Sequence, residues 1–224
     1  MFFHPAYLIV IPGILLMFWA QNRVKGTYRR YAQVRSKLGM TGAQTARAIL
    51  QKMNITGVKV EPVAGELTDH YDPRAKAVRL SQGIYDSDSL AAAAIAAHEC
   101  GHVLQDYRGY AFMNFRAALA PAANIGSQIG PMLVIAGVFL AATGLSTIGM
   151  ILFAAVIAFH LITLPVEFDA SRRALKLINQ LGILQGEENE GAKAVLQAAA
   201  WTYVATAFYA VLQLIYFFLL SRNR

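Results

Sequence analysis

Fifty consecutive residues, Ala117 to Val166, contain no Asp, Glu, Lys or Arg. They read AALAPAANIGSQIGPMLVIAGVFLAATGLSTIGMILFAAVIAFHLITLPV. An α-helix rises about 1.5 Å per residue, and about 20 apolar residues cross the hydrocarbon core of a bilayer. The run is therefore long enough for two spans, and Gly144-Leu145-Ser146-Thr147 is the natural turn between them. We expect a pair of membrane-spanning helices near 124–143 and 147–166.

Two further uncharged runs, at 1–22 and 194–221, predict a first span near 2–21 and a fourth near 198–220. The first run lacks a basic region before it and a small-residue cleavage site after it, which argues against a cleaved signal peptide. Only 15% of the 224 residues are charged and 56% are hydrophobic, so disorder is excluded and a water-soluble globule is disfavoured. The single cysteine, Cys100, excludes an internal disulfide.

Basic residues directly after the first run set the orientation. Six Lys or Arg residues lie between Arg23 and Lys37, and no acidic residue lies among them. The positive-inside rule places this segment in the cytoplasm and the N-terminus outside. Because the cluster adjoins a span, we interpret it as a topology signal that contacts lipid headgroups, and not as a nucleic-acid surface. The charged portions 22–116 and 167–197 are separated by two spans, so both should be cytoplasmic parts of one integrated domain, 1–224.

The portion 22–116 has the pattern of a small α+β arrangement. Thr41 and Gln44 form a capping box that opens a helix to about Met53. Strands are expected at 57–63, 66–71 and 77–81, with a turn at 72–76. The acidic, hydroxyl-rich residues 86–89 open a helix from Leu90 to about Tyr107, and further helices are expected at 167–182 and 187–197. The fold class is therefore a mainly α, polytopic membrane protein with about four transmembrane helices and a small α+β cytoplasmic portion.

The helix from Leu90 carries His98-Glu99-Cys100-Gly101-His102, an H-E-x-x-H pattern. Residues four apart lie on the same helix face in adjacent turns, so His98 and His102 can chelate one Zn²⁺ through ring nitrogens. Glu99 lies one step around the helix, where it can reach an activated water without binding the metal. The alternative is a helix with two idle surface histidines. Cys100 points away from the ligand face and is interpreted as a packing residue.

A catalytic zinc needs a third protein ligand and one open position. Glu167 is the leading candidate, because it follows the third span directly and the even number of crossings returns it to the side of His98 and His102. Asp169 competes with it, but lies about 200° around a helix from Glu167, so the two would not bind together. The alternative is that Glu167 only pairs with Arg172 or Arg173. We interpret His160 as a packed intramembrane histidine, with a functional intramembrane group as the alternative. We interpret His70 as a surface turn residue, with a donor to an oxyanion as the alternative.

Three stretches resemble the YugP-like neutral zinc metallopeptidases, a family of small bacterial membrane proteins. They are Asp69-His70-Tyr71-Asp72-Pro73, Ala97-His98-Glu99-Cys100-Gly101-His102 and Pro165-Val166-Glu167-Phe168-Asp169-Ala170-Ser171. More distantly the chain is similar to the HtpX and CAAX prenyl protease group. The resemblance implies a zincin-like fold of the gluzincin kind, one zinc per chain, His98, His102 and Glu167 as ligands, and Glu99 as catalytic residue. It also implies a multi-pass protein of the bacterial inner membrane whose site faces the cytoplasm.

One position departs from that wider group, which usually has E-x-x-x-D after the metal-binding helix. Here the fourth residue after Glu167 is Ser171 and not Asp. The carboxylate that orients a ligand histidine must therefore come from elsewhere, or the serine replaces it.

The favoured function is peptide-bond hydrolysis by an endopeptidase that uses Glu99 as general base. The substrate is a protein or peptide, including membrane proteins, and an extended segment of it is expected to pair with a sheet edge near Ala77–Ser81.

The alternative is a non-catalytic membrane scaffold or binding protein with a structural metal, although such sites usually use several cysteines. Cleavage inside the bilayer is disfavoured, because only ten uncharged residues separate Asp88 from Glu99. A transporter is the weakest alternative, because the spans carry no Asp, Glu, Lys or Arg. The sequence does not indicate an oligomeric state.

Overall fold

The computed structural model describes residues 5–222, which form two compact units. Of these residues, unit 1 comprises 5–21, 111–165 and 201–222, and unit 2 comprises Asn22–Tyr110 and Val166–Ala200. Within the described residues, four helical segments are long and apolar enough to cross a membrane. They are Pro5–Ala32, Ala111–Phe139, Thr143–Gln180 and Glu187–Arg222. With one small sheet in unit 2, this confirms the mainly α, polytopic fold class.

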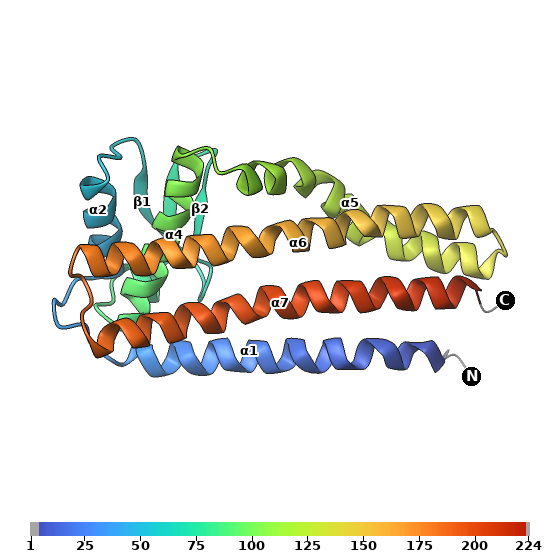
Figure 1. The fold of residues 1–224 in the computed structure, drawn as a ribbon, viewed down its shortest axis with the longest axis horizontal. Helices are drawn as coiled ribbons and strands as arrows, with labels where there is room; N and C mark the ends of the chain where they lie inside the picture. The colour runs from blue at the N-terminus through green and yellow to red at the C-terminus, as the bar shows by residue number, and fades with distance from the viewer. Residues whose placement is uncertain (1–4, 223–224) are drawn as a thin grey trace. The chain divides into compact units, whose positions relative to one another are not determined.

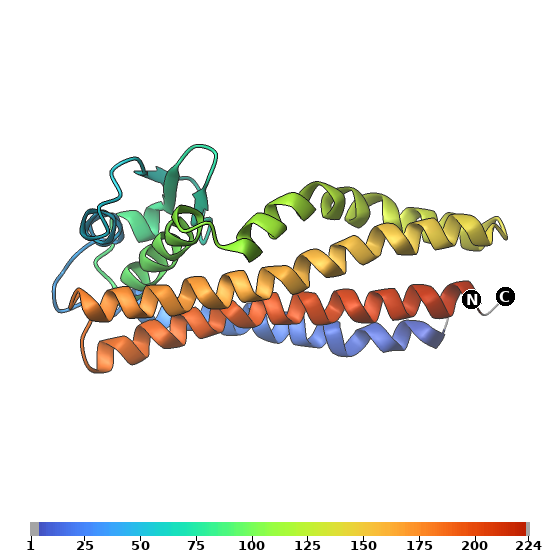
Figure 2. The ribbon, with the colours of Figure 1, turned by 45° about the horizontal axis from the view of Figure 1, so that its top comes forward.

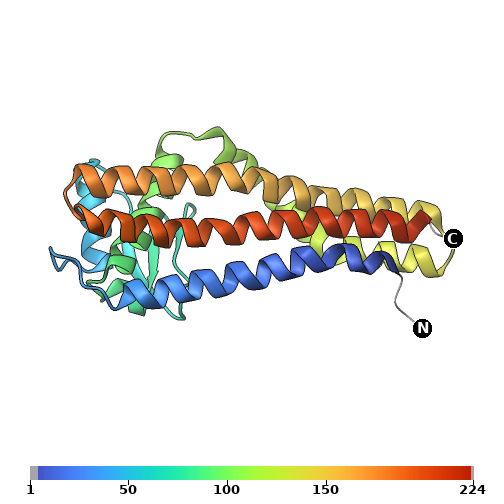
Figure 3. The same cartoon turned by 60° about the horizontal axis from the view of Figure 1, so that its bottom comes forward.

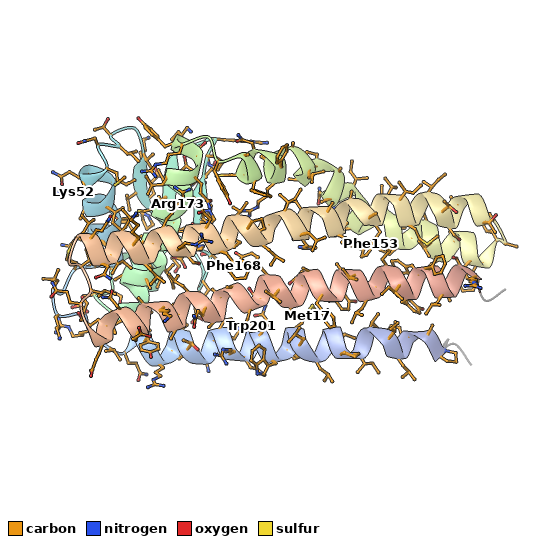
Figure 4. The ribbon with its side chains drawn as sticks, viewed as in Figure 1. Met17, Lys52, Phe153, Phe168, Arg173 and Trp201 are labelled. Carbon is orange, nitrogen blue, oxygen red and sulfur yellow. The ribbon has the colours of Figure 1, made fainter. Side chains whose placement is uncertain are left out.

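Unit 1 is built from these long helices (Figure 1). Its elements are the 3-10 helix η1 (Pro5–Val10) and parts of α1 (Ile11–Ala32), α5 (Ala111–Phe139), α6 (Thr143–Gln180) and α7 (Glu187–Arg222). Within this unit α7 lies between α1 and α6, as Figures 1 and 3 both show. Its apolar core joins α5, α6 and α7 through Val134, Phe153, Val156 and Phe217. Phe153 and Phe217 meet edge to face at 5.3 Å, and Trp201, labelled in Figure 4 with Phe153, meets Trp19 in the same way at 5.4 Å.

The turn between α5 and α6 comes earlier than the sequence pattern predicts. Helix α5 ends at Phe139, and Ala141 adopts the left-handed conformation with φ 54°. The N–H of Ala142 donates to the carbonyl of Gly137 at 2.9 Å, the six-residue bond of a Schellman motif. Residues from Thr143 onward are therefore already helical, and the predicted turn at 144–147 was wrong by a few residues.

Pro165 does not break the third long helix, although a separate helix was expected at 167–182. It lies inside α6, which continues to Gln180, so the predicted separate helix at 167–182 is the second half of α6. A proline removes a single backbone hydrogen bond, and a helix supported by neighbours on both sides of it tolerates the loss. Similarly, the predicted helix at 187–197 and the fourth span are one helix, α7.

Unit 2 contains a three-stranded sheet of order β1-β3-β2 (Figure 2). Strand β1 (Lys59–Val63) pairs parallel with β3 (Ala77–Ser81), and β2 (His70–Asp72) pairs antiparallel with β3 through the expected turn. Since β3 is paired on both sides, the prediction of a free edge near Ala77–Ser81 was wrong. Strand β2 is shorter than expected, because the carboxylate of Asp69 and not a strand carbonyl accepts the Ser81 N–H at 2.8 Å.

Helices α2 (Gly42–Lys52) and α4 (Leu90–Tyr107) pack together and both contact the sheet, with the short α3 (Gln82–Tyr85) beside them. The predicted capping box of α2 is confirmed, since Thr41 Oγ1 accepts the Gln44 N–H and Gln44 Oε1 accepts the Thr41 N–H. On β3, Val78 and Leu80 are fully buried, whereas Arg79 on the opposite face bonds Asp72 at 2.8 Å. The core of unit 2 thus lies between the sheet and these helices.

Candidate metal centre

Helix α4 presents two histidines from one face. Its N-cap is Ser89, whose hydroxyl accepts the N–H of Ala92 at 3.2 Å, and six of the eight residues from Leu90 to Ala97 are fully or almost fully buried alanines. Small side chains let neighbouring elements approach the helix closely. The rings of His98 and His102 then lie one turn apart with centroids separated by 4.8 Å at an interplanar angle of 83°. The spacing in the sequence therefore produces the shared face that it predicts.

Helix α6 brings Glu167 to these histidines. The approach depends on Gly101, because a Cβ atom at that position would lie 2.5 Å from the carbonyl oxygen of Ala170. Without the side chain, α4 and this segment of α6 meet backbone to backbone. Glu167 is 3% exposed, and its Oε2 lies 3.3 Å from Nε2 of His98 and 3.6 Å from Nε2 of His102.

The three side chains have the geometry of a zinc site. Among residues 5–222 the ligand-type atoms of His98, His102 and Glu167 form a group within 4.8 Å of one another. Ligands about 2.0–2.1 Å from a tetrahedral zinc ion stand about 3.3–3.4 Å apart. The observed separations of 3.3 Å and 3.6 Å are close to this value and longer than good hydrogen bonds to a carboxylate. The donor set, two imidazoles and one carboxylate, also suits zinc.

The remaining ring nitrogens are held by polar side chains. Nδ1 of His98 lies 3.2 Å from Ser171 Oγ, and Nδ1 of His102 lies 2.9 Å from Gln105 Oε1. When Nε2 of a neutral imidazole binds a metal, Nδ1 carries the hydrogen, and these oxygens are placed to accept a hydrogen bond from it. Ser171 thus occupies the place of the missing carboxylate, as one of the sequence-based alternatives expected. Gln105 was missed, although a glutamine in the stretch Val103-Leu104-Gln105 is a visible polar exception.

Asp169 is directed elsewhere. Its Oδ2 accepts hydrogen bonds from Gln105 Nε2 at 2.9 Å and from Arg173 Nε at 2.5 Å. Figure 4 labels Arg173 and Phe168 on this stretch of α6. The structure therefore brings Glu167 to the histidines and gives Asp169 to the arginine, which is the division that their spacing on a helix predicts.

Burial and charge tune the acids and bases of the site. Burial raises the pKa of Glu99 above its usual range, the two histidines lower it, and Glu167 and Asp69 raise it. Burial alone would lower the pKa of His102, but the hydrogen bond and charge of Glu167 outweigh it and the pKa is raised. Burial opposes ionisation of Glu167, yet the bonds to His102 and His98 hold its pKa well below the usual range. The ionised form of Glu167 is thus favoured beside the two histidines.

The other sequence candidates are not members of this group. His70 is exposed, as expected, but it is the first residue of β2 and not a turn residue, and its Nδ1 contacts the carbonyl of Thr68 at 2.8 Å. Cys100 is buried and its Sγ faces the Ala46 carbonyl of α2 at 3.7 Å, which confirms a packing role. His160 belongs to unit 1 and stacks edge to face with Phe159 at 5.7 Å. Asp69, which the sequence pattern did not single out as a site residue, is close enough for its charge to affect Glu99.

Comparison with known proteins agrees with this geometry. Residues 6–222 match the family described as "Putative neutral zinc metallopeptidase". The chain belongs to this family. It is also similar to "Putative membrane protease YugP" of Bacillus subtilis (strain 168), with 42% identity over 215 residues that cover 96% of this chain and 96% of the relative. No solved structure matches the chain.

Membership of the neutral zinc metallopeptidase family makes Zn²⁺ the cofactor, and the residues present fit it. It also makes peptide-bond hydrolysis the general activity and a protein or peptide the general substrate. The four long apolar helices agree with the membrane location in the name of the Bacillus relative.

Proposed function

We propose that this chain is a zinc-dependent membrane endopeptidase in which His98, His102 and Glu167 hold the metal and Glu99 is the general base. The observation that carries the proposal is the convergence of two Nε2 atoms on one Glu167 oxygen, at 3.3 Å and 3.6 Å, beside a buried glutamate on the same helix. The three donors come from two different elements, α4 and α6, so the arrangement is not a by-product of helix periodicity alone.

Each residue of the proposed site has a defined task in this reaction. Zinc bound at the three side chains supplies Lewis acidity, which activates water and polarises a carbonyl group. Glu99 accepts the proton of the attacking water on its carboxylate and delivers it to the amide nitrogen of the leaving fragment. Burial raises the pKa of Glu99, which makes its carboxylate a stronger base towards this proton.

The number of protein donors favours this function over a structural metal. The group formed by described residues contains three donors, and the one cysteine is directed at α2. Structural zinc sites are usually closed by four protein ligands.

We further propose that the site faces the cytoplasm of a bacterial cell, at the inner membrane. The support is the basic segment from Arg23 to Lys37 after the first uncharged run, together with the two spans expected between His102 and Glu167. Both portions that supply ligands then lie on one side of the membrane.

The test compares detergent-purified wild type with Glu99→Gln, Glu167→Ala and the matched control Glu190→Gln, an exposed glutamate whose carboxyl pairs with Lys193 at 3.6 Å. Zinc content and hydrolysis of an unfolded protein substrate are measured on the same samples. We expect one zinc per chain and hydrolysis in wild type and control, zinc without hydrolysis in Glu99→Gln, and loss of both in Glu167→Ala. Full hydrolysis by zinc-loaded Glu99→Gln would remove the proposed mechanism.

A further inference from the structure

Gln105 is a fully buried polar side chain on α4, and all of its hydrogen-bonding groups are directed at the metal centre or its supports. It is 0% exposed. Its Oε1 lies 2.9 Å from His102 Nδ1, and its Nε2 lies 2.7 Å from the carbonyl oxygen of Val166 and 2.9 Å from Asp169 Oδ2. A buried amide with three partners at these distances holds a single orientation.

The partners determine which way the amide faces. The Val166 carbonyl and the Asp169 carboxylate can only accept, so the amide –NH₂ group must point at them. Oε1 then faces His102, and because this oxygen also only accepts, His102 Nδ1 must carry the hydrogen. The other ring nitrogen, Nε2, is the atom that faces Glu167 at 3.6 Å. The amide thus selects the ring form that a metal ligand needs.

The same side chain connects the two helices that supply ligands. His102 lies on α4, whereas Val166 is the residue of α6 immediately before Glu167. Asp169, the third partner, is held in turn by Arg173, whose guanidinium lies 5.7 Å from the centroid of the Tyr110 ring. One amide therefore links the position of His102 to that of Glu167. The same amide donates a hydrogen bond to the carboxylate of Asp169, which Arg173 holds in place.

We propose that Gln105 is a positioning residue, which fixes the tautomer of His102 and the approach of Glu167 and places the charge of Asp169 one amide away from the histidine. In zinc sites a carboxylate often contacts the ligand histidine directly. Here the amide stands between them, because it alone among side chains accepts one hydrogen bond from His102 while donating two others. The inference rests on the proposed metal site, but not on the chemistry of Glu99.

Ser171, which contacts Nδ1 of His98 as Gln105 contacts Nδ1 of His102, makes fewer hydrogen bonds. Ser171 offers one hydroxyl at 3.2 Å from Nδ1, and no other bond of that hydroxyl is found among residues 5–222. We therefore expect Gln105 to matter more for zinc binding than Ser171.

The experiment measures zinc affinity by competition with a chelator, on detergent-purified full-length protein. The variants are Gln105→Leu, Gln105→Glu, the double variant Gln105→Glu with Asp169→Asn, and the control Gln51→Leu at an exposed helix position. Loss of a side chain that orients a ligand typically weakens metal binding about 10- to 100-fold. We expect that range for Gln105→Leu, and for Gln105→Glu as well, since a carboxylate would face the Val166 carbonyl and the Asp169 carboxylate. The double variant should recover part of the loss, because the introduced asparagine can donate to the introduced glutamate.

A second readout reports the tautomer. In zinc-loaded protein labelled with ¹⁵N-histidine, the Nδ1–H proton of His102 should be protected from exchange in wild type and control, and lose that protection in Gln105→Leu. A general packing defect would not distinguish this proton from that of His98. If Gln105→Leu fails to fold, the test still stands on Gln105→Glu, which has nearly the same shape as the wild-type side chain, and on the double variant Gln105→Glu with Asp169→Asn.

Two outcomes would overturn the inference: wild-type zinc affinity in Gln105→Glu, or a double variant that binds zinc no better than Gln105→Glu alone. Failure of the proposed function looks different. It would appear as wild-type protein that binds zinc tightly but hydrolyses no substrate, while the Gln105 variants still lose zinc affinity as expected. It would also appear as wild-type protein that binds no zinc.

Discussion

At the scale of single residues, the absent side chain of Gly101 determines how closely α4 and α6 approach. We expect Gly101→Ala to destabilise the fold by about 1–3 kcal/mol, the usual cost of inserting a methylene into a close-packed contact. The added Cβ would meet the Ala170 carbonyl at 2.5 Å, and backbone on both sides cannot move aside as a side chain would. The thermal unfolding temperature in detergent and the zinc affinity should both fall.

The control is Gly26→Ala on α1, where nothing lies within 4 Å of the added Cβ. There alanine should be neutral or stabilising by about 0.5–1 kcal/mol, because it improves helix propensity. Equal unfolding temperatures for the two variants would contradict the close approach at Gly101.

Zinc binding should depend on pH through His102. A ligand imidazole must be neutral, so protons compete with the metal. The pKa of His102 is raised above the ordinary 6.5 by Glu167, against the effect of burial. The group is neutral above its pKa, so affinity is full at higher pH and is lost as the pH falls through the raised value. Glu167 has a lowered pKa and stays ionised in this range.

The measurement is chelator competition at several pH values between about 5 and 9. We expect affinity to begin falling at a higher pH than the titration of an ordinary histidine would give. Affinity that stays constant to below about pH 6 would show that Glu167 does not favour the protonated ring in the metal-free protein.

Local chemistry in the sequence predicted the two histidines and Glu99, because i and i+4 on a helix face one way whatever surrounds them. Glu167 required a longer argument from membrane crossings, and the structure places it where that argument expects. Gln105 could not be assigned, because its role depends on the carbonyl of Val166 and on Asp169, which lie on a helix 61 and 64 residues away in the chain.

At the scale of elements, α4 depends on its N-cap. Ser89 is 2% exposed and its hydroxyl accepts the Ala92 N–H at 3.2 Å. Replacing an N-cap serine by alanine costs about 0.5–2 kcal/mol, and we expect Ser89→Ala to lower the thermal midpoint accordingly. The control is Ser87→Ala, whose hydroxyl donates to Ser89 but does not cap the helix, and it should cost less. The reverse order would mean that Ser87 and not Ser89 secures the helix start.

Elements with local signals were predictable and those with distant partners were not. The capping box of α2 and the turn between β2 and β3 involve residues within five positions of each other. The central position of β3 depends on parallel pairing with β1, which begins 18 residues earlier at Lys59↔Ala77. Likewise, Pro165 indicates a helix end by itself, yet α6 continues through it to Gln180.

At the scale of the whole molecule, the proposed orientation can be measured with single cysteines. Four spans with a cytoplasmic basic segment put the turn between β2 and β3 inside the cell and the connection between α5 and α6 outside. Arg74 is an exposed position in the first place, and Gly144 is an exposed position at the start of α6, next to the second. Cys100 is fully buried and burial raises the pKa of its thiol, so the native cysteine should not react.

We therefore expect a membrane-impermeant maleimide to label Gly144→Cys on intact protoplasts, and to label Arg74→Cys only after the membrane is opened. Wild type, with Cys100 alone, should remain unlabelled in both conditions. The opposite pattern would place the metal site outside the cell. It would also mean that the six basic residues between Arg23 and Lys37 face the outer surface, against the charge asymmetry that orients most membrane proteins.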